Sequence, residues 1–238
     1  MSDQRRGAVI TGAAGDLGRD LAESFLRDGY VVFGADVMPQ PPIEGLVAAT
    51  LDVTDRAAVF ALAARAAAET RLECWINAAG IFLTVPVPAA SEADWQRIIA
   101  VNLTGVFHGC AAALDVLSRA GGGRIVNIGS VSGQIGGVGV HPAYGASKAG
   151  VHSLTKTYAL EGARHGVLCN AVAPSLLDGS MSRIFSVAQR ERLARTNPLG
   201  RMGRVGEVTR VVRFLADLGQ TFVNGAVVPV NGGSYMPS

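Results

Sequence analysis

The sequence predicts a single α/β domain with a doubly wound parallel sheet of about seven strands and helices on both faces. Short apolar runs rich in β-branched residues recur along the 238 residues, as in strands that are buried on both faces. Helix-like segments lie between these runs, and such alternation is typical of a parallel sheet. Because no linker rich in proline or serine and no internal repeat divides the chain, we expect residues 1–238 to fold as one domain.

Seven segments are predicted as strands because they are short, apolar and bounded by turn residues. In chain order they are residues 8–11, 31–35, 47–51, 74–77, 124–129, 167–172 and 226–230. The predicted helices cover residues 16–28, 55–69, 95–119, 143–164 and 206–218, and a further helix begins at residue 91. Their ends carry capping signals: Gly29 follows the first helix, Asp55 opens the second after Thr54, and Ser91 forms a capping box with Asp94.

Residues 175–206 contain no clear strand and are the least regular stretch of the chain. Loops of this length in compact domains usually have a function. We therefore expect this segment to be a lid over the substrate site.

Composition and charge exclude several classes of protein. Hydrophobic residues make up 49% of the chain and its net charge is +2, which excludes a disordered chain. The longest basic run is Arg5 with Arg6, so we expect no nucleic-acid partner. Cys74, Cys110 and Cys169 have no spacing suited to zinc, so we expect no metal, and free thiols indicate a reducing compartment.

The sequence also bears on the location of the protein. The first seven residues lack the apolar core of a signal peptide. The longest alanine-rich stretch, residues 57–68, is too short to cross a bilayer. We therefore expect a cytoplasmic protein with no membrane partner.

A glycine-rich turn joins the first predicted strand to the first predicted helix and reads Thr11-Gly12-Ala13-Ala14-Gly15-Asp16-Leu17-Gly18. Glycines at this point let the backbone approach a pyrophosphate, and the helix N-terminus supplies free N–H groups and the positive end of its dipole. The second strand ends at Asp36, where a carboxylate can accept hydrogen bonds from ribose hydroxyls and repels a 2′-phosphate. The turn and the carboxylate together predict dinucleotide binding, with NAD rather than NADP.

A tyrosine and a lysine lie four residues apart in Tyr144-Gly-Ala-Ser-Lys148. Side chains at this spacing share one face of a helix, and Lys156 is the other lysine of the chain. An ammonium beside a phenol favours the phenolate, so we expect Lys148 to lower the pKa of Tyr144 below its usual value of about 10. Such a pair is suited to moving a proton during catalysis.

These and further motifs resemble the short-chain dehydrogenase/reductase family over nearly the whole chain. The further motifs are, in order, Asp52-Val53, Asn77-Ala78-Ala79-Gly80, Val101-Asn102, Ser130, Asn170 to Pro174, Pro198 to Arg201 and Val230 to Gly233. The resemblance implies a Rossmann fold. It also implies an oxidoreductase that exchanges a hydride with a nicotinamide dinucleotide.

The resemblance implies a role for each matching residue. Tyr144 would be the general acid for ketone reduction and the base for alcohol oxidation, while Lys148 would hold the nicotinamide ribose. Ser130, with Ser132 as a lesser candidate, would stabilise charge on the substrate oxygen, and Asn102 would hold a water in the proton relay. The residues implied to bind the cofactor are Gly12, Gly15, Asp16, Leu17, Gly18, Asp36, Asp52, Val53, Asn77, Ala78, Ala79, Gly80, Tyr144, Lys148, Pro174 and Leu177.

Three positions depart from the family pattern. Asp16 stands where the family has its middle glycine, and Ser175 follows Pro174 in place of a glycine. Gly179 replaces a threonine that contacts the carboxamide, with Ser180 as the nearest substitute. A carboxylate near a pyrophosphate is unfavourable, so we expect the side chain of Asp16 to turn toward the helix N-terminus.

The segments implied to line the substrate pocket are mostly apolar, and the first two contain neither lysine nor arginine. We therefore expect a neutral, apolar or aromatic secondary alcohol and its ketone, interconverted with NAD. His141 is expected on the rim of this pocket or on the surface. The residues predicted to contact the substrate are Phe82, Val138, Leu176, Met181 and Phe185.

Two alternatives stay open. A 3-oxoacyl thioester reductase, acting on acyl-carrier-protein or coenzyme A thioesters, has the same motifs, although Asp36 argues against the NADP expected there. The second alternative is a non-catalytic dinucleotide-binding regulator. The presence of Ser130, Tyr144 and Lys148 argues against it, because such a protein would not need them. The resemblance also implies a homotetramer, formed through the long helices beside the fifth strand and through the last strand.

Overall fold

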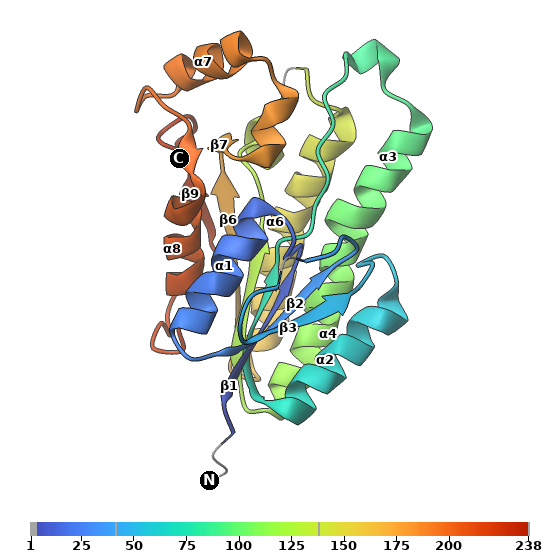
Figure 1. Cartoon of the computed structure of the whole chain (residues 1–238), viewed down its shortest axis with the longest axis vertical. Helices are drawn as coiled ribbons and strands as arrows, with labels where there is room; N and C mark the ends of the chain where they lie inside the picture. Colours follow the sequence, from blue (N-terminus) through green and yellow to red (C-terminus); the bar gives the residue numbers. More distant parts are fainter. Residues whose placement is uncertain (1–3, 41, 138, 238) are drawn as a thin grey trace.

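Seven parallel strands form one sheet at the centre of the computed structural model, which describes residues 4–40, 42–137 and 139–237 (Figure 1). The strand order is β3-β2-β1-β4-β5-β6-β9. From β1 the chain runs outward to β3, returns to β4 on the other side of β1 and continues to β9, which is the doubly wound arrangement. This confirms the predicted fold class. The strands are β1 (Arg6–Thr11), β2 (Val31–Asp36), β3 (Leu46–Thr50), β4 (Arg71–Asn77), β5 (Gly123–Ile128), β6 (Val167–Pro174) and β9 (Val227–Val230).

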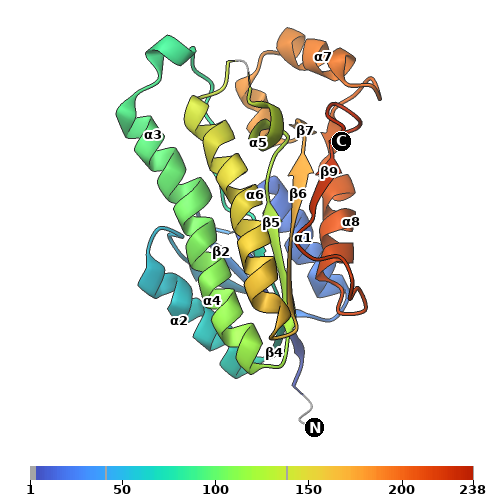
Figure 2. The ribbon, with the colours of Figure 1, turned by 180° about the vertical axis from the view of Figure 1, so that it is seen from behind.

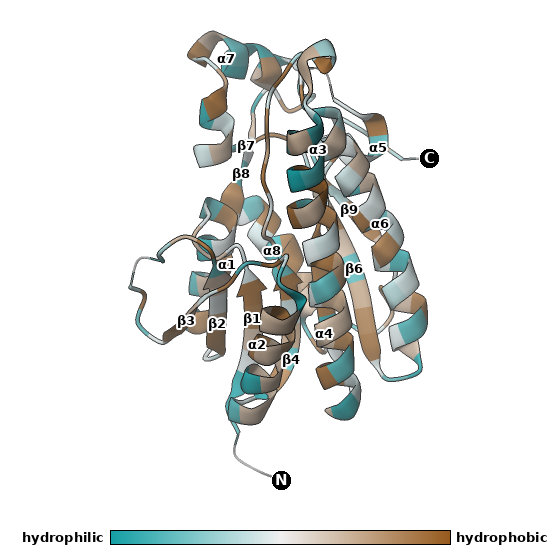
Figure 3. Ribbon diagram, turned by 90° about the vertical axis from the view of Figure 1, so that its right-hand side faces the viewer, coloured by the Kyte–Doolittle hydropathy of each residue, from teal (hydrophilic) through white to brown (hydrophobic). Residues whose placement is uncertain are grey.

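Helices cover both faces of the sheet (Figures 1 and 2). One face carries α1 (Asp16–Arg27) and α8 (Val205–Ala216), and the other carries α2 (Arg56–Glu69), α4 (Gly105–Arg119) and α6 (Pro142–Ala163). Side chains of β1 alternate between the two layers: Ala8 and Ile10 join the core beneath α1 and α8, and Val9 joins the other core. Figure 3 shows the consequence, with hydrophobic residues concentrated in the strands and hydrophilic ones on the outer helix surfaces.

The capping signals in the sequence act as predicted. Asp55 accepts the backbone N–H of Ala58 at 3.0 Å at the start of α2. Ser91 accepts that of Asp94 at 3.1 Å, where α3 (Glu92–Ile99) begins. Gly29, with φ +79°, follows the end of α1. Each device satisfies backbone groups that the helix ends leave free.

The helices predicted from residue 91 and over residues 95–119 form one continuous segment. α3 runs through a π-turn, η2 (Ala100–Thr104), directly into α4. Among the described residues this is the one helix that is long and apolar enough to cross a membrane. Half of its most apolar window is buried within the fold, where α4 packs against α2 and α6. The segment therefore has the surroundings of a core helix.

Residues 175–206 are more regular than the sequence indicates. β7 (Leu177–Asp178) and β8 (Gly203–Arg204) pair in parallel and join the two ends of this segment. Between them lie η3 (Ser180–Ile184) and α7 (Val187–Thr196), which sit beyond the carboxyl ends of the strands (Figure 1). We call residues 175–206 the lid. Sequence patterns also missed η1 (Val87–Ala89) and α5 (Ser132–Ile135), because elements this short carry no hydrophobic period.

Candidate active site

The carboxyl ends of β1 and β4 meet at the glycine-rich turn. Thr11 ends β1, and its Oγ1 accepts the backbone N–H groups of Ala78 at 3.2 Å and Ala79 at 3.3 Å, directly after β4. Gly12 has φ +74°, and a Cβ there would lie 2.6 Å from the nitrogen of Ala79. A Cβ on Gly18 would lie 2.1 Å from the carbonyl oxygen of Gly12. Both positions therefore require glycine.

This turn fits the pyrophosphate of a dinucleotide. Gly15 is the N-cap of α1 and has no side chain with which to cap the helix, so the first N–H groups of α1 are available to an anion. Leu17, in the first turn, packs against the core and fixes the helix on the sheet. The chain thus offers a cradle of backbone without Cβ atoms, followed by a helix N-terminus.

Asp36 lies beside the same turn at the end of β2. Its Oδ2 accepts the backbone N–H of Ala14 and its Oδ1 accepts that of Met38, both at 2.9 Å. These bonds hold the carboxylate next to the glycine-rich turn, where the ribose of a dinucleotide is expected.

Asp52 and Val53 follow β3 at the same end of the sheet. Asp52 Oδ1 accepts the N–H and the hydroxyl of Thr54, both at 2.8 Å. Val53 is buried, and a Cβ on Gly105 of α4 would lie 2.5 Å from its Cγ2. Their contacts with the cofactor stay a prediction.

The structure places the side chain of Asn77 in the core. Its Oδ1 accepts the indole N–H of Trp75 at 2.8 Å, and its Nδ2 donates to Asn127 Oδ1 at 2.8 Å and contacts Cys110 Sγ at 3.4 Å. Asn127 donates in turn to Thr155 Oγ1 at 3.0 Å. This buried network joins β4, β5, α4 and α6. The side chain therefore supports the strand below Ala78, Ala79 and Gly80, and the predicted contact of Asn77 with the cofactor stays a prediction.

Asn102 and Lys148 converge at Gly80. Asn102 is fully buried in the π-turn, where its Oδ1 accepts the N–H of Ile81 at 2.8 Å and its Nδ2 donates to the carbonyl of Ile81 at 2.9 Å. Lys148 Nζ donates to the carbonyl of Ile128 at 2.7 Å. A Cβ on Gly80 would lie 3.4 Å from Asn102 Oδ1 and 3.7 Å from Lys148 Nζ. Both polar atoms of the Asn102 amide are thus hydrogen-bonded to the backbone of Ile81. The water that Asn102 was predicted to hold for the proton relay stays a prediction.

Ser130 and Tyr144 lie together at the carboxyl end of β5. Ser130 is near enough to the phenol to act on its pKa, and Lys148 Nζ lies 5.8 Å from the centre of the Tyr144 ring. Ser130 Oγ also accepts the backbone N–H of Ser132 at 3.1 Å. Ser132 thus contacts Ser130 through its backbone, and the catalytic role of Ser130 stays a prediction.

Burial sets the protonation of the tyrosine and the lysine. It raises the pKa of Tyr144 above its ordinary value, and this outweighs the lowering by Ser130. Burial also lowers the pKa of Lys148 to about 8. The expectation that Lys148 brings the pKa of Tyr144 below its usual value is therefore wrong for this structure. Tyr144 is protonated at neutral pH, as a general acid must be.

Two of the predicted substrate residues form an aromatic wall with Tyr144. The ring of Phe82 meets that of Tyr144 edge to face, with centroids 4.9 Å apart and planes at 87°. Phe185 of the lid lies 6.0 Å from Phe82, centroid to centroid. Leu176 is half-buried and Met181 is exposed, and their contacts with the substrate stay a prediction. The remaining candidate, Val138, lies outside the described residues.

The lid begins where β6 ends, close to Ser130. Pro174, the last residue of β6, accepts the backbone N–H of Val131 at 2.9 Å. Leu177 lies in β7 and packs against the core beneath α1 and α8. Ser175 Oγ donates to the carbonyl of Asn231 at 3.3 Å, which ties the lid to the segment after β9.

His141 is buried, contrary to the expectation of a rim or surface position. It is the N-cap of α6, where its Nδ1 accepts the backbone N–H of Ala143 at 3.2 Å. The backbone N–H of His141 donates to the carbonyl of Leu83 at 3.0 Å. These bonds fix the first turn of α6, which carries Tyr144, against the segment after β4. His141 Nε2 has no hydrogen-bond partner among the described residues.

The carboxylate of Asp16 turns to the lid and not to the N-terminus of its own helix. It accepts the backbone N–H of Ser180, and hydrogen bonds from Ser180 with the charge of Arg183 lower the pKa of Asp16. A Cβ on Gly179 would lie 2.7 Å from Asp16 Oδ2. The expected orientation is therefore wrong, and two departures from the family pattern explain each other, because the aspartate occupies the space that a side chain at position 179 would need.

Sequence reasoning passed over His152, one helical turn after Lys148. Its Nε2 accepts the backbone N–H of Ser130 at 3.4 Å. The sequence could have indicated this position, because a residue four places after Lys148 lies on the same face of α6. No group of three or more His, Cys, Asp or Glu among the described residues is arranged to hold a metal ion.

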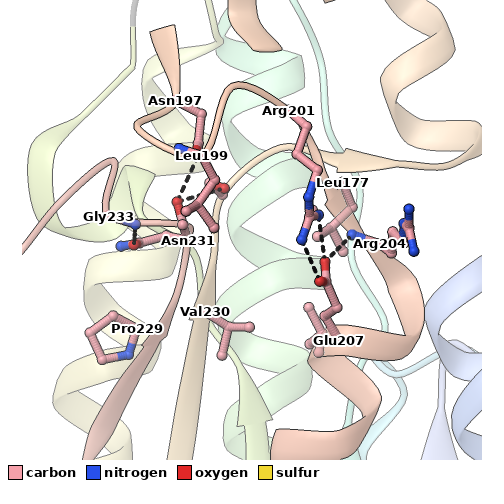
Figure 4. A pocket seen from close by; sticks show the side chains of 14 residues that line it. Leu177, Asn197, Leu199, Arg201, Arg204, Glu207, Pro229, Val230, Asn231 and Gly233 are labelled. Atoms are coloured by element: carbon pink, nitrogen blue, oxygen red, sulfur yellow. Dashed lines mark hydrogen bonds and ion pairs between the residues drawn. The ribbon is translucent and has the colours of Figure 1, made fainter. Parts of the chain in front are cut away.

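A pocket of about 270 Å³ lies beside the lid, next to α8 and β9 (Figure 4). Arg201 forms an ion pair with Glu207 there at 2.6 Å, and Glu207 also accepts the N–H of Arg204 at 2.7 Å. Of the predicted site residues that the structure describes, Leu177 alone lines this pocket. Ser130, Tyr144 and Lys148 are not among the residues that line it.

Residues 12–235 match the family described as enoyl-(acyl carrier protein) reductase. The chain is also 35% identical over 248 residues to a 3-oxoacyl-[acyl-carrier-protein] reductase of Pseudomonas aeruginosa, covering 99% of this chain and 100% of the relative. This chain belongs to the short-chain dehydrogenase/reductase family. It is an oxidoreductase, and the alternative of a non-catalytic regulator is not supported.

Other members of the short-chain dehydrogenase/reductase family are similar to this one. A (3R)-3-hydroxyacyl-CoA dehydrogenase of Mus musculus is 40% identical over 162 residues, which are 68% of this chain and 62% of that protein. The solved structure of ElxO with NADP bound superimposes with a TM-score of 0.88 at 26% identity, covering 97% of this chain and 98% of that one. The names of the two sequence relatives favour the 3-oxoacyl thioester alternative over the apolar secondary alcohol.

Proposed function

We propose that this enzyme interconverts a 3-oxoacyl thioester and the corresponding 3-hydroxyacyl thioester with a nicotinamide dinucleotide. The observation that carries the proposal is the meeting of Ser130, Tyr144 and Lys148 beside an aromatic wall. The wall of Phe82 and Phe185 suits an acyl chain, and the 35% identity to a 3-oxoacyl reductase extends over the whole chain. The hydroxyl groups of Ser130 and Tyr144 suit reduction of a carbonyl, which needs a proton at oxygen.

The residues of the chain handle the proton and the developing charge. The dinucleotide, when bound in the cradle of Gly12 and Gly18, supplies or accepts the hydride. Ser130 donates a hydrogen bond to the carbonyl oxygen of the substrate, and Tyr144 gives its phenolic proton to the same oxygen as negative charge develops there. The ammonium of Lys148, anchored on the carbonyl of Ile128, stabilises the phenolate that remains.

We propose NAD as the preferred dinucleotide. The support is the carboxylate of Asp36, held beside the glycine-rich turn by the N–H groups of Ala14 and Met38. A negative charge there accepts hydrogen bonds from ribose hydroxyls and repels a 2′-phosphate. The solved structure of ElxO holds NADP, so the choice of NAD for this chain is argued from Asp36 and not from the fold.

We also propose a cytoplasmic homotetramer. Large apolar side chains are exposed on the two long helices beside β5, with Phe107 of α4 at 40% and Leu160 of α6 at 82% exposure. Covering such residues is favourable in water. Light scattering of the purified protein is expected to give four times the chain mass, and a monomer would contradict this proposal.

The test is a comparison of substrates with the purified enzyme. We expect turnover of an acetoacetyl thioester with NADH, followed by nicotinamide absorbance, at a higher kcat/KM than with an aryl methyl ketone or a 2-enoyl thioester. Tyr144→Phe is expected to lose about 10²- to 10⁴-fold in kcat because it removes the proton donor. It should keep its affinity for NADH, measured by nicotinamide fluorescence. Turnover of the aryl ketone alone would overturn the thioester proposal, and unchanged kcat in Tyr144→Phe would overturn the mechanism.

A further inference from the structure

A buried histidine lies against the catalytic serine and has no part in the mechanism above. His152 is 7% exposed and lies on α6, where its Nε2 accepts the backbone N–H of Ser130 at 3.4 Å. We infer that His152 is a positioning residue for Ser130. It holds the backbone of the serine from behind and thereby sets where the serine hydroxyl lies relative to the hydroxyl of Tyr144.

The sheet offers the N–H of Ser130 no partner. Its neighbours Gly129 and Val131 donate their N–H groups to carbonyl groups of β6 at 2.8 and 2.9 Å. Because N–H groups alternate along an extended chain, that of Ser130 points away from β6. On this side β4 ends at Asn77, before it reaches the level of Ser130. A buried N–H without an acceptor is unfavourable, and His152 supplies the acceptor.

The ring of His152 occupies a space that two glycines leave open on either side of Ser130 in the chain. A Cβ on Gly129 would lie 2.3 Å from His152 Nε2, and a Cβ on Gly133 would lie 2.8 Å from its Cε1. A side chain on Gly129 would push the ring away from the serine. A Cβ on Gly133 would also lie 2.6 Å from the backbone carbonyl carbon of Lys148, so Gly133 is needed for the close approach of α6 as well as for the ring.

The contact requires an unprotonated Nε2, since only that form accepts a hydrogen bond. Burial lowers the pKa of His152 to about 4, and the charges of Lys148 and Lys156 on the same helix act in the same direction. The imidazole is therefore neutral at physiological pH, with its proton on Nδ1.

The inference rests on the catalytic role proposed for Ser130, but its first test does not depend on turnover. Nitrogen NMR of the four histidines, with His152 identified by the signal lost in His152→Gln, reads the protonation of each ring atom. We expect His152 to stay neutral with the proton on Nδ1 down to pH 5. A proton on Nε2, or titration near pH 6.5, would overturn the inference whatever the enzyme acts on.

The second test compares two polar substitutions in the acetoacetyl thioester assay. His152→Gln places its amide oxygen near the position of Nε2 and is expected to keep kcat within about threefold of the parent. The side chain of His152→Asn is too short to reach Ser130, so its kcat is expected to fall about 10- to 100-fold. KM and the affinity for NADH should change little in either variant.

The matched control is His165→Asn, an exposed histidine beyond the end of α6, which should leave kcat unchanged. Equal activity of His152→Gln and His152→Asn, both folded, would overturn the positioning role. A parent enzyme inactive on the thioester would contradict the proposed substrate instead, and the same variants would then be compared on the carbonyl compound that is turned over.

Discussion

Asp16 and Ser180 are 164 residues apart in the chain and share a hydrogen bond, in which the carboxylate accepts the backbone N–H of the serine. The contact joins the first turn of α1, where a pyrophosphate is expected, to the start of η3 in the lid. It gives the acidic residue of the glycine-rich turn a partner within the protein. The position of the lid is therefore linked to the cofactor site.

Removing this carboxylate is expected to loosen the lid. In Asp16→Ala, hydrogen exchange of residues 179–184 should accelerate at least about tenfold, because the acceptor of the Ser180 N–H is lost. Asp16→Asn, which keeps one oxygen, should have an intermediate effect. Asp115→Asn, on the exposed surface of α4, is the control and should leave exchange in the lid unchanged. Equal exchange in all four proteins would contradict the role of Asp16.

The same contact predicts a pH dependence. The pKa of Asp16 is lowered from its ordinary value of 3.8 by hydrogen bonds from Ser180 and by the charge of Arg183. A group whose pKa is lowered on folding stabilises the fold above its ordinary pKa and loses this effect as the pH falls through the lowered value. Protection of residues 179–184, corrected for intrinsic exchange, should therefore be constant from pH 5 to 8. A loss of protection within that range would contradict the assignment.

Two glycines of the same turn should respond differently to an added methyl group. Gly18→Ala would place its Cβ 2.1 Å from the carbonyl oxygen of Gly12, whereas Gly15→Ala would place it at an ordinary 3.4 Å. We expect Gly18→Ala to lower the free energy of unfolding by about 1–3 kcal/mol and to weaken NADH binding at least about tenfold. The free energy of unfolding of Gly15→Ala should lie within about 0.5 kcal/mol of that of the parent. Denaturant titration and nicotinamide fluorescence measure both effects, and equal stability of the two variants would contradict the packing described.

Asp36 allows the effect of charge to be separated from that of hydrogen bonding. Asp36→Asn removes the charge but keeps one oxygen for Ala14 or Met38, and Asp36→Ala removes both bonds. We expect the ratio of the dissociation constants for NADPH and NADH to fall at least about tenfold in each variant. Asp36→Ala alone should also lose affinity for NADH. A ratio unchanged in both variants would show that Asp36 does not select the cofactor.

Lys148 should make catalysis possible at a cost in stability. Burial lowers its pKa from 10.5 to about 8, a difference equivalent to at most about 3 kcal/mol. Lys148→Met is therefore expected to abolish turnover and raise Tm at pH 7, while Lys156→Met, exposed on the same helix, should not change Tm. Between pH 8 and 10.5 the unfolded chain binds the proton more strongly, so the stability of the parent should rise toward that of Lys148→Met. A lower Tm in Lys148→Met would contradict this account.

The strands and long helices could be predicted because each leaves a local pattern. Runs such as residues 31–35 are continuously apolar because β2 is buried on both faces, and Asp55 and Ser91 mark helix starts by bonding within their own first turns. The pairing of β7 with β8 left no such pattern. Two residues on each side suffice once the chain has brought them together, and so short a run shows no hydrophobic period.

The sequence by itself determined the fold class, the family and the set of Ser130, Tyr144 and Lys148, because these depend on residue type and on spacing along the chain. Tertiary structure alone decided that burial raises the pKa of Tyr144, that the amide of Asn77 is used in the core, and that His152 supports Ser130. It also decided that Asp16 holds the lid. The physical reason is common to all four: solvation, charge and hydrogen-bond partners are set by which distant segments the fold brings within a few ångströms of each other.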